Sequence, residues 1–202
     1  MAGNKNRSYK KGAPHRDFRK FIIVAEGERE DGYFNYFEGK SKRVTVEIVQ
    51  REGGKSAAKY LIQRLEDYNS QFGIEPEDFV WFVLDVDRWP RDTIDDVIVF
   101  CAKIENYNVS ISNPCFEVWL HYHALKAIPK ELDSAAKLKA NLPLIVKGGY
   151  NTEKFISLIE SAIFNAYKAD KDRKHDFPDV NISKVYSLAS KLLAFLGKNW
   201  RD

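Results

Sequence analysis

The sequence contains few cysteines and no long apolar run, and these absences exclude several classes of protein. Its two cysteines, Cys101 and Cys115, have no metal-binding spacing and are too few for a disulfide framework. We therefore interpret both as small buried apolar residues. No stretch approaches the roughly 18–20 consecutive apolar residues that cross a bilayer, and the N-terminal segment has no apolar signal-peptide core. We expect a soluble cytoplasmic protein with no membrane association.

The composition is that of a folded domain with unevenly placed charge. Of the 202 residues, 44% are hydrophobic and 13% are aromatic, enough for a large core. The net charge is +3, but residues 1–20 carry seven basic residues against Asp17, a local charge of +6, so the remainder sums to −3. A basic arm on an acidic body is typical of a protein that binds a polyanion, and a solubilising tail explains it equally well. The basic residues are Lys5, Arg7, Lys10, Lys11, Arg16, Arg19 and Lys20.

Short apolar segments alternate with amphipathic segments in the first two thirds of the chain. The apolar segments predict strands and the amphipathic ones predict helices. The predicted strands are 21–27, 44–50, 79–87 and 109–112, and the predicted helices are 28–39, 56–72, 93–107 and a helix opening at Pro114. Beyond residue 130 the pattern is helical only, with helices at 133–140, 151–169 and 183–197 and a connector at 142–151.

This alternation predicts an α/β fold. We expect a small parallel four-stranded sheet of Rossmann-like type, with strand order 2-1-3-4 and helices on both faces. The chain then divides into a flexible basic arm (1–17), an α/β core (18–130) and a helical extension packed on the core (131–202). Ligands of such sheets bind outside the carboxyl ends of the strands, where the strand order reverses.

Acidic residues follow three of the predicted strands. In VWFVLDVDRWP, Asp85 and Asp87 end the third strand, and strand alternation places them on the same side, about 6–7 Å apart. Glu26 ends the neighbouring first strand, and Glu117 lies in the helix after the fourth. Carboxylates gathered at one edge repel unless a cation neutralises them, and Mg²⁺ or Mn²⁺ prefers such oxygen ligands. The pattern therefore predicts a divalent-metal site of Glu26, Asp85 and Asp87, with Glu117 as a further catalytic residue.

Other polar residues near this edge are candidates for substrate binding. Ser112 and Asn113 end the fourth strand, and Arg88 follows Asp87. Lys147 precedes a double glycine, and His123 lies in the helix that contains Glu117. The acids, His123 and Lys147 also have structural interpretations, since strand-end acids cap helices, histidines lie at core edges and lysines are commonly exposed.

Several of these segments together resemble the RloB-like family, which belongs with the Toprim-type folds. They are FIIVAEGERE with YFNYF, VWFVLDVDRW, ISNPCFEVWLHYH and NISKVYSLASKLL, and the resemblance spans residues 18–197. It implies a glutamate after the first strand and a DxD after the third, at Glu26, Asp85 and Asp87. It also implies a Mg²⁺-dependent phosphodiester-processing centre, in systems associated with restriction and phage defence and often beside an AAA-type ATPase. The threonine–acid step of the pattern appears here as Glu30-Asp31, a departure from the family.

We therefore expect a metal-dependent nuclease that acts on DNA or RNA. No tyrosine is placed as a strand-passage nucleophile, which favours hydrolysis over strand transfer. Two alternatives remain open at this point: a non-catalytic or partner-gated effector that docks an ATPase or senses nucleic acid, and a phosphotransferase or primase-like enzyme using the same acids.

Overall fold

A computed structural model describes residues 18–50, 58–198 and 200–201 of the chain. The predicted basic arm, residues 1–17, lies outside the described residues. The strands are β1 (Arg19–Ala25), β2 (Val44–Ile48), β3 (Phe79–Asp85), β4 (Tyr107–Asn113) and β5 (Ile182–Ser183). The helices are α1 (Glu28–Asn35), α2 (Ala58–Phe72), the 3₁₀ helix η1 (Val86–Arg88), α3 (Arg91–Cys101), α4 (Glu117–Tyr122), α5 (Ala135–Ile145), α6 (Thr152–Ser157), α7 (Ile159–Ala169) and α8 (Val185–Leu196).

The strands form one sheet in the order β2-β1-β3-β4-β5. β1 to β4 are parallel, which confirms the predicted order of the first four strands. β1 is apolar after Arg19 and Lys20, and β3 is apolar up to Asp85, as expected for strands with helices on both faces. The prediction of a purely parallel sheet was wrong, since β5 pairs antiparallel with β4. β5 has two residues, too few for a periodicity signal.

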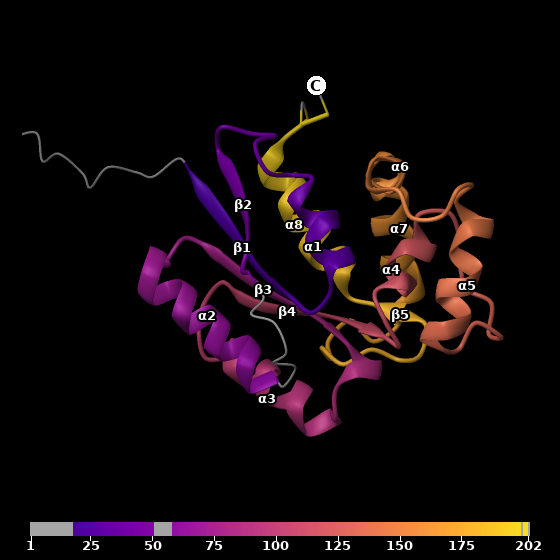
Figure 1. Ribbon diagram of the computed structural model, residues 1–202, viewed down its shortest axis with the longest axis horizontal. Coiled ribbons are helices and arrows are strands. Elements are labelled where there is room, and N and C mark those ends of the chain that lie inside the picture. The colour runs from indigo at the N-terminus through magenta and orange to yellow at the C-terminus, as the bar shows by residue number, and fades with distance from the viewer. Residues whose placement is uncertain (1–17, 51–57, 199, 202) are drawn as a thin grey trace, which may run out of the picture.

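Helices cover both faces of the sheet, as Figure 1 shows. On one face, α2 and α3 pack against alternate residues of the central strands, including Ile22, Val80 and Phe82. On the other face, α1 and α8 pack against the residues in between, such as Ile23 and Trp81. Because side chains alternate between the two faces of a strand, the apolar residues divide between two cores, one on each face of the sheet.

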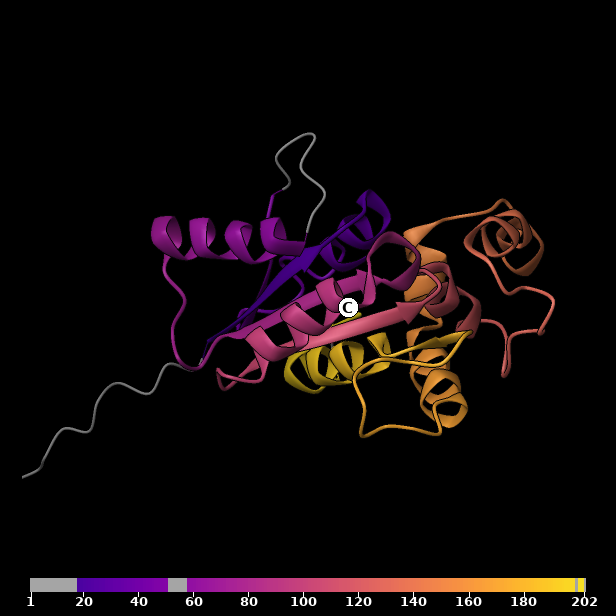
Figure 2. The ribbon, with the colours of Figure 1, turned by 90° about the horizontal axis from the view of Figure 1, so that it is seen from below.

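The remaining helices, α4 to α7, gather beyond the carboxyl ends of the strands (Figures 1 and 2). Their buried residues share one apolar cluster with β1, β3, α1 and α8. Two predicted boundaries differ in this region. The connector predicted at 142–151 begins inside α5, and the single helix predicted at 151–169 is divided at Leu158.

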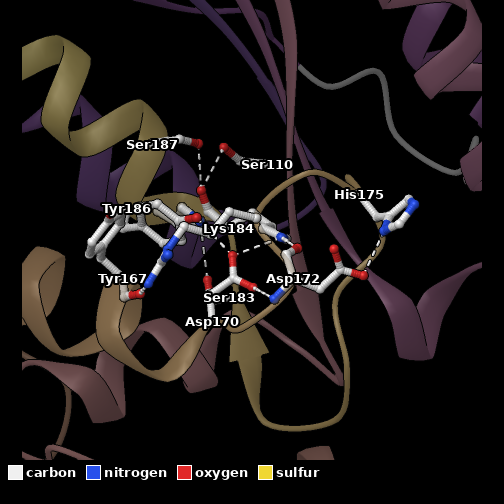
Figure 3. A network of polar contacts seen from close by, with 11 residues as sticks. Ser110, Tyr167, Asp170, Asp172, His175, Ser183, Lys184, Tyr186 and Ser187 are labelled. Carbon is white, nitrogen blue, oxygen red and sulfur yellow. Dashed lines mark hydrogen bonds and ion pairs between the residues drawn. The ribbon is translucent and has the colours of Figure 1, made fainter.

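A buried ion pair fastens the loop between α7 and β5 to the start of α8 (Figure 3). Lys184 Nζ lies 2.7 Å from Asp170 Oδ2 and donates to the carbonyl oxygen of Asp172 at 2.6 Å. The Tyr186 hydroxyl donates to the same Asp170 oxygen at 2.7 Å. Because the Lys184 backbone N–H also donates to the carbonyl of Ile111 in β4, this network connects the helical segment to the sheet.

Cys101 and Cys115 are buried free thiols, as predicted. Within the described residues, every helix is too short or too polar to cross a membrane.

Candidate functional site

A cavity of about 510 Å³ opens at the carboxyl ends of β1 and β3. It lies where the strand order reverses, which is the expected ligand position in such sheets. The sheet, α1 and the helical segments after β4 all contribute to its walls. Its lining residues are Glu26, Gly27, Glu28, Arg29, Glu30, Asp85, Arg88, Glu117, Lys139 and Tyr150.

Glu26 and Asp85 meet at the floor of this cavity. Glu26 directly follows β1 and Asp85 is the last residue of β3, and the two strands pair side by side. The backbone N–H of Asp85 donates to Glu26 Oε1 at 3.3 Å. Asp85 is only 7% exposed, and its Oδ1 is buried without a hydrogen-bond partner among the described residues. Two acids 59 positions apart in the chain thus share one site, as the strand pattern predicts.

Asp87 lies differently from the prediction. β3 ends at Asp85, and Val86 to Arg88 form the 3₁₀ helix η1. The strand alternation that was expected to place Asp85 and Asp87 on one side therefore stops before Asp87. Asp87 is exposed, and Arg88 lines the cavity in its place. The negative charge of Asp87 still contributes to raising the pKa of Glu26 and of Asp85, after the larger effect of burial, so it lies near them.

Two further acids of the lining, Glu30 and Glu117, are buried. Glu30 is buried in the first turn of α1, close to Gly27, where a Cβ atom would collide with the Glu30 carboxylate. Glu117 is buried at the start of α4 and accepts a hydrogen bond from Arg29 Nη1. The absence of a side chain at Gly27 therefore permits the close approach of the Glu30 carboxylate.

Burial raises the pKa values of Glu26, Glu30 and Asp85. The pKa of Glu26 rises from 4.5 to about 9, mainly through loss of water, with a smaller contribution from Glu30. The pKa of Glu30 rises to about 7, again mainly through burial and then through the charge of Glu117. The pKa of Asp85 lies well above its ordinary value, because of burial and then Glu30 and Glu26. Buried carboxylates with raised pKa values favour either protonation or a bound cation.

Three basic or aromatic residues of the cavity were not identified from the sequence as site residues. Arg29 comes from α1, Lys139 from α5 and Tyr150 from the loop before α6. Lys139 and Tyr150 belong to the helical extension, and no strand-end pattern marks them. Arg29 lies three residues after Glu26, between Glu28 and Glu30, in a segment whose pattern is acidic.

Four predicted substrate-binding residues lie outside the cavity lining. Ser112 is buried and its Oγ is 2.8 Å from Ser183 Oγ, so it joins β4 to β5. Asn113 donates from Nδ2 to the carbonyl of Pro178 at 2.9 Å. Lys147 is exposed.

His123 is enclosed in the core, where its Nε2 lies 2.9 Å from the Tyr33 hydroxyl. Burial lowers the pKa of His123 to about 3. Its surroundings match the structural interpretation of a histidine at the edge of the core.

The family model described as RloB-like protein matches residues 21–192. The chain belongs to the RloB-like family. The matched range contains all the residues that line the cavity. Searches of curated proteins and of solved structures found no match.

The lining of this cavity offers oxygen ligands of the kind that a divalent cation prefers. All its acidic donors are carboxylate oxygens, which Mg²⁺ and Mn²⁺ prefer, and Asp85 Oδ1 is a buried oxygen without a hydrogen-bond partner in the described residues. The donor set therefore fits such an ion. Within the described part of the chain, however, no three His, Cys, Asp or Glu side chains are already arranged to hold a metal.

Proposed function

We propose that this protein is a metal-dependent nuclease with its centre in the acidic cavity. The observation that carries the proposal is the gathering of Glu26, Glu30, Asp85 and Glu117 around one cavity at the carboxyl ends of the strands. One or two carboxylates and bound waters are enough to hold Mg²⁺, so the acids gathered around this cavity are sufficient for such an ion. The strand order and the membership in the RloB-like family support a Toprim-type arrangement.

The residues have distinct roles in this proposal. Glu26 and Asp85 hold the cation, and Asp87 becomes a third ligand through a side-chain rearrangement at η1. When bound, Mg²⁺ or Mn²⁺ supplies polarisation of the phosphoryl oxygen and a more acidic water. Glu117 orients a water or serves as an additional ligand. Arg88 and Lys139 attract the phosphate backbone to the rim of the cavity.

The test is digestion of mixed DNA and RNA by the purified chain, with Mg²⁺, with Mn²⁺ and with EDTA. We expect cleavage with either metal, none with EDTA and none by Asp85→Asn. Asp96→Asn is the matched control, because Asp96 is exposed on α3 and lies outside the cavity lining. Equal cleavage by the wild type and Asp85→Asn would assign the activity to a contaminant or another site.

A second candidate is a partner-gated effector. It is favoured by the ion pair between Arg29 and Glu117, which occupies one of the carboxylates, and by the lack of a preformed three-residue metal group in the described chain. In this case the isolated chain binds metal but cuts nothing, and activity or signalling begins when an ATPase partner docks, as in a restriction or phage-defence system. Cleavage by the isolated chain would exclude this candidate.

A further inference from the structure

Arg29 lies in the acidic cavity and pairs with one of its carboxylates. Its Nη1 donates to Oε1 of Glu117, which is 88 positions later in the chain. The Glu117 side chain is 5% exposed and that of Arg29 is 36% exposed. The carboxylate is therefore enclosed, while the Arg29 side chain keeps access to solvent.

Tyr150 holds this part of α1 against the helical extension. Its hydroxyl donates to the carbonyl oxygen of Arg29 at 3.1 Å, and the Arg29 guanidinium carbon lies 5.3 Å from the centroid of the Tyr150 ring. The preceding Gly148 and Gly149 have φ angles of 92° and 79°, left-handed values that glycine adopts without a steric penalty. Two segments remote from α1 in sequence thus place Arg29 in the cavity.

The cavity lining carries more acids than bases. Carboxylates that lie close together in a poorly hydrated site repel one another unless a cation lies among them. Arg29 supplies such a cation at Glu117, and a divalent ion would need to overcome both this pair and its own repulsion from the guanidinium. The acids of the lining are Glu26, Glu28, Glu30, Asp85 and Glu117, and the bases are Arg29, Arg88 and Lys139.

We infer that Arg29 is an internal counter-cation of this cavity. It neutralises Glu117 in the metal-free protein, and a divalent cation gains the use of Glu117 only by displacing the guanidinium. The inference rests on the proposed function, because it requires a divalent cation at this site. Its consequence is that Arg29 sets the metal affinity: the ion pair stabilises the metal-free state and weakens metal binding.

The test is a Mn²⁺ titration of the full chain, followed by the electron paramagnetic resonance signal of free Mn²⁺. We expect Arg29→Gln to bind Mn²⁺ about tenfold more tightly than the wild type, a change of about 1.4 kcal/mol. Arg88→Gln is the matched control, because it removes the same charge from the same cavity lining and leaves the pair of Arg29 with Glu117 in place. The Mn²⁺ affinity of Arg88→Gln should increase clearly less than that of Arg29→Gln.

Thermal unfolding supplies a readout that is independent of the titration. In EDTA, Arg29→Gln should melt below the wild type, because the buried carboxylate of Glu117 loses its partner. Added Mn²⁺ should then raise its melting temperature by more than it raises that of the wild type.

Four outcomes would overturn the inference. If the wild type binds Mn²⁺ and Arg29→Gln binds it no more tightly, or if the two glutamine variants gain equally, Arg29 has no special role and the metal site stands. If none of the proteins binds Mn²⁺, the inference and the proposed metal centre fail together. Arg29→Lys keeps the cation and should resemble the wild type, so equal tightening in this variant would assign the effect to disturbed packing.

Discussion

Replacing Glu26 by Gln should stabilise the metal-free protein, although Glu26 is a proposed metal ligand. The glutamine keeps an oxygen that accepts the hydrogen bond from the Asp85 N–H, which Glu26 Oε1 accepts at 3.3 Å. It removes a carboxyl group whose pKa is raised to about 9 by burial and by neighbouring acids. A residue that is kept for function often carries such a stability penalty.

The direction of this stability change follows from the number of protons that the folded and unfolded states bind. Between pH 4.5 and about pH 9 the folded protein keeps Glu26 protonated while the unfolded chain releases that proton. The folded state therefore binds more protons, and the free energy of unfolding falls as the pH rises through this window. At pH 7 the penalty is about 2.5 pH units multiplied by 1.36 kcal/mol, or about 3 kcal/mol. At pH 5 it is below about 1 kcal/mol.

The assay is urea unfolding of the wild type and Glu26→Gln in EDTA at pH 5 and at pH 7, followed by tryptophan fluorescence. We expect the stability gain of the variant to grow from below about 1 kcal/mol to about 3 kcal/mol between these two values. Glu66→Gln, at an exposed position of α2, should show no such growth. A gain that is equal at both pH values, or a loss at pH 7, would refute the reasoning that Glu26 is held protonated in the fold.

Three further predictions concern the rest of the chain. Lys184→Met should lower the free energy of unfolding by about 3–5 kcal/mol, because it leaves the buried Asp170 carboxylate without its cation. Lys137→Met, in the exposed pair with Asp133, should leave the urea midpoint unchanged; similar losses in both variants would contradict the role of burial. Phe155→Ala should cost about 3–5 kcal/mol in one cooperative transition, since Phe155 is fully buried in the cluster shared with β1; two separate transitions would contradict a shared core. Removing residues 1–17 should reduce the slope of log K for nucleic acid against log salt by up to about 4, measured by fluorescence anisotropy, and an unchanged slope would make the arm a tail with no role in binding.

The strand framework and part of the acidic site follow from the sequence. The apolar runs that form β1 to β4 are short, bounded and rich in β-branched and aromatic residues, so local pattern identifies them. Once their order is expected to be 2-1-3-4, the residues after β1 and at the end of β3 must be neighbours, which places Glu26 beside Asp85. Parallel pairing of β1 and β3 puts their carboxyl ends side by side, so the order of the strands alone predicts that these two residues are neighbours.

The tertiary structure alone decides which groups surround those two acids. Arg29 pairs with Glu117 through a contact between residues far apart in the chain. Lys139 and Tyr150 line the same cavity although they belong to the helical extension. The short β5 and the turn of η1, which directs Asp87 away from the strand alternation, are likewise decided by packing around them. Periodicity reports which face of one element is buried, whereas the neighbours across a cavity are chosen by how separate elements pack together.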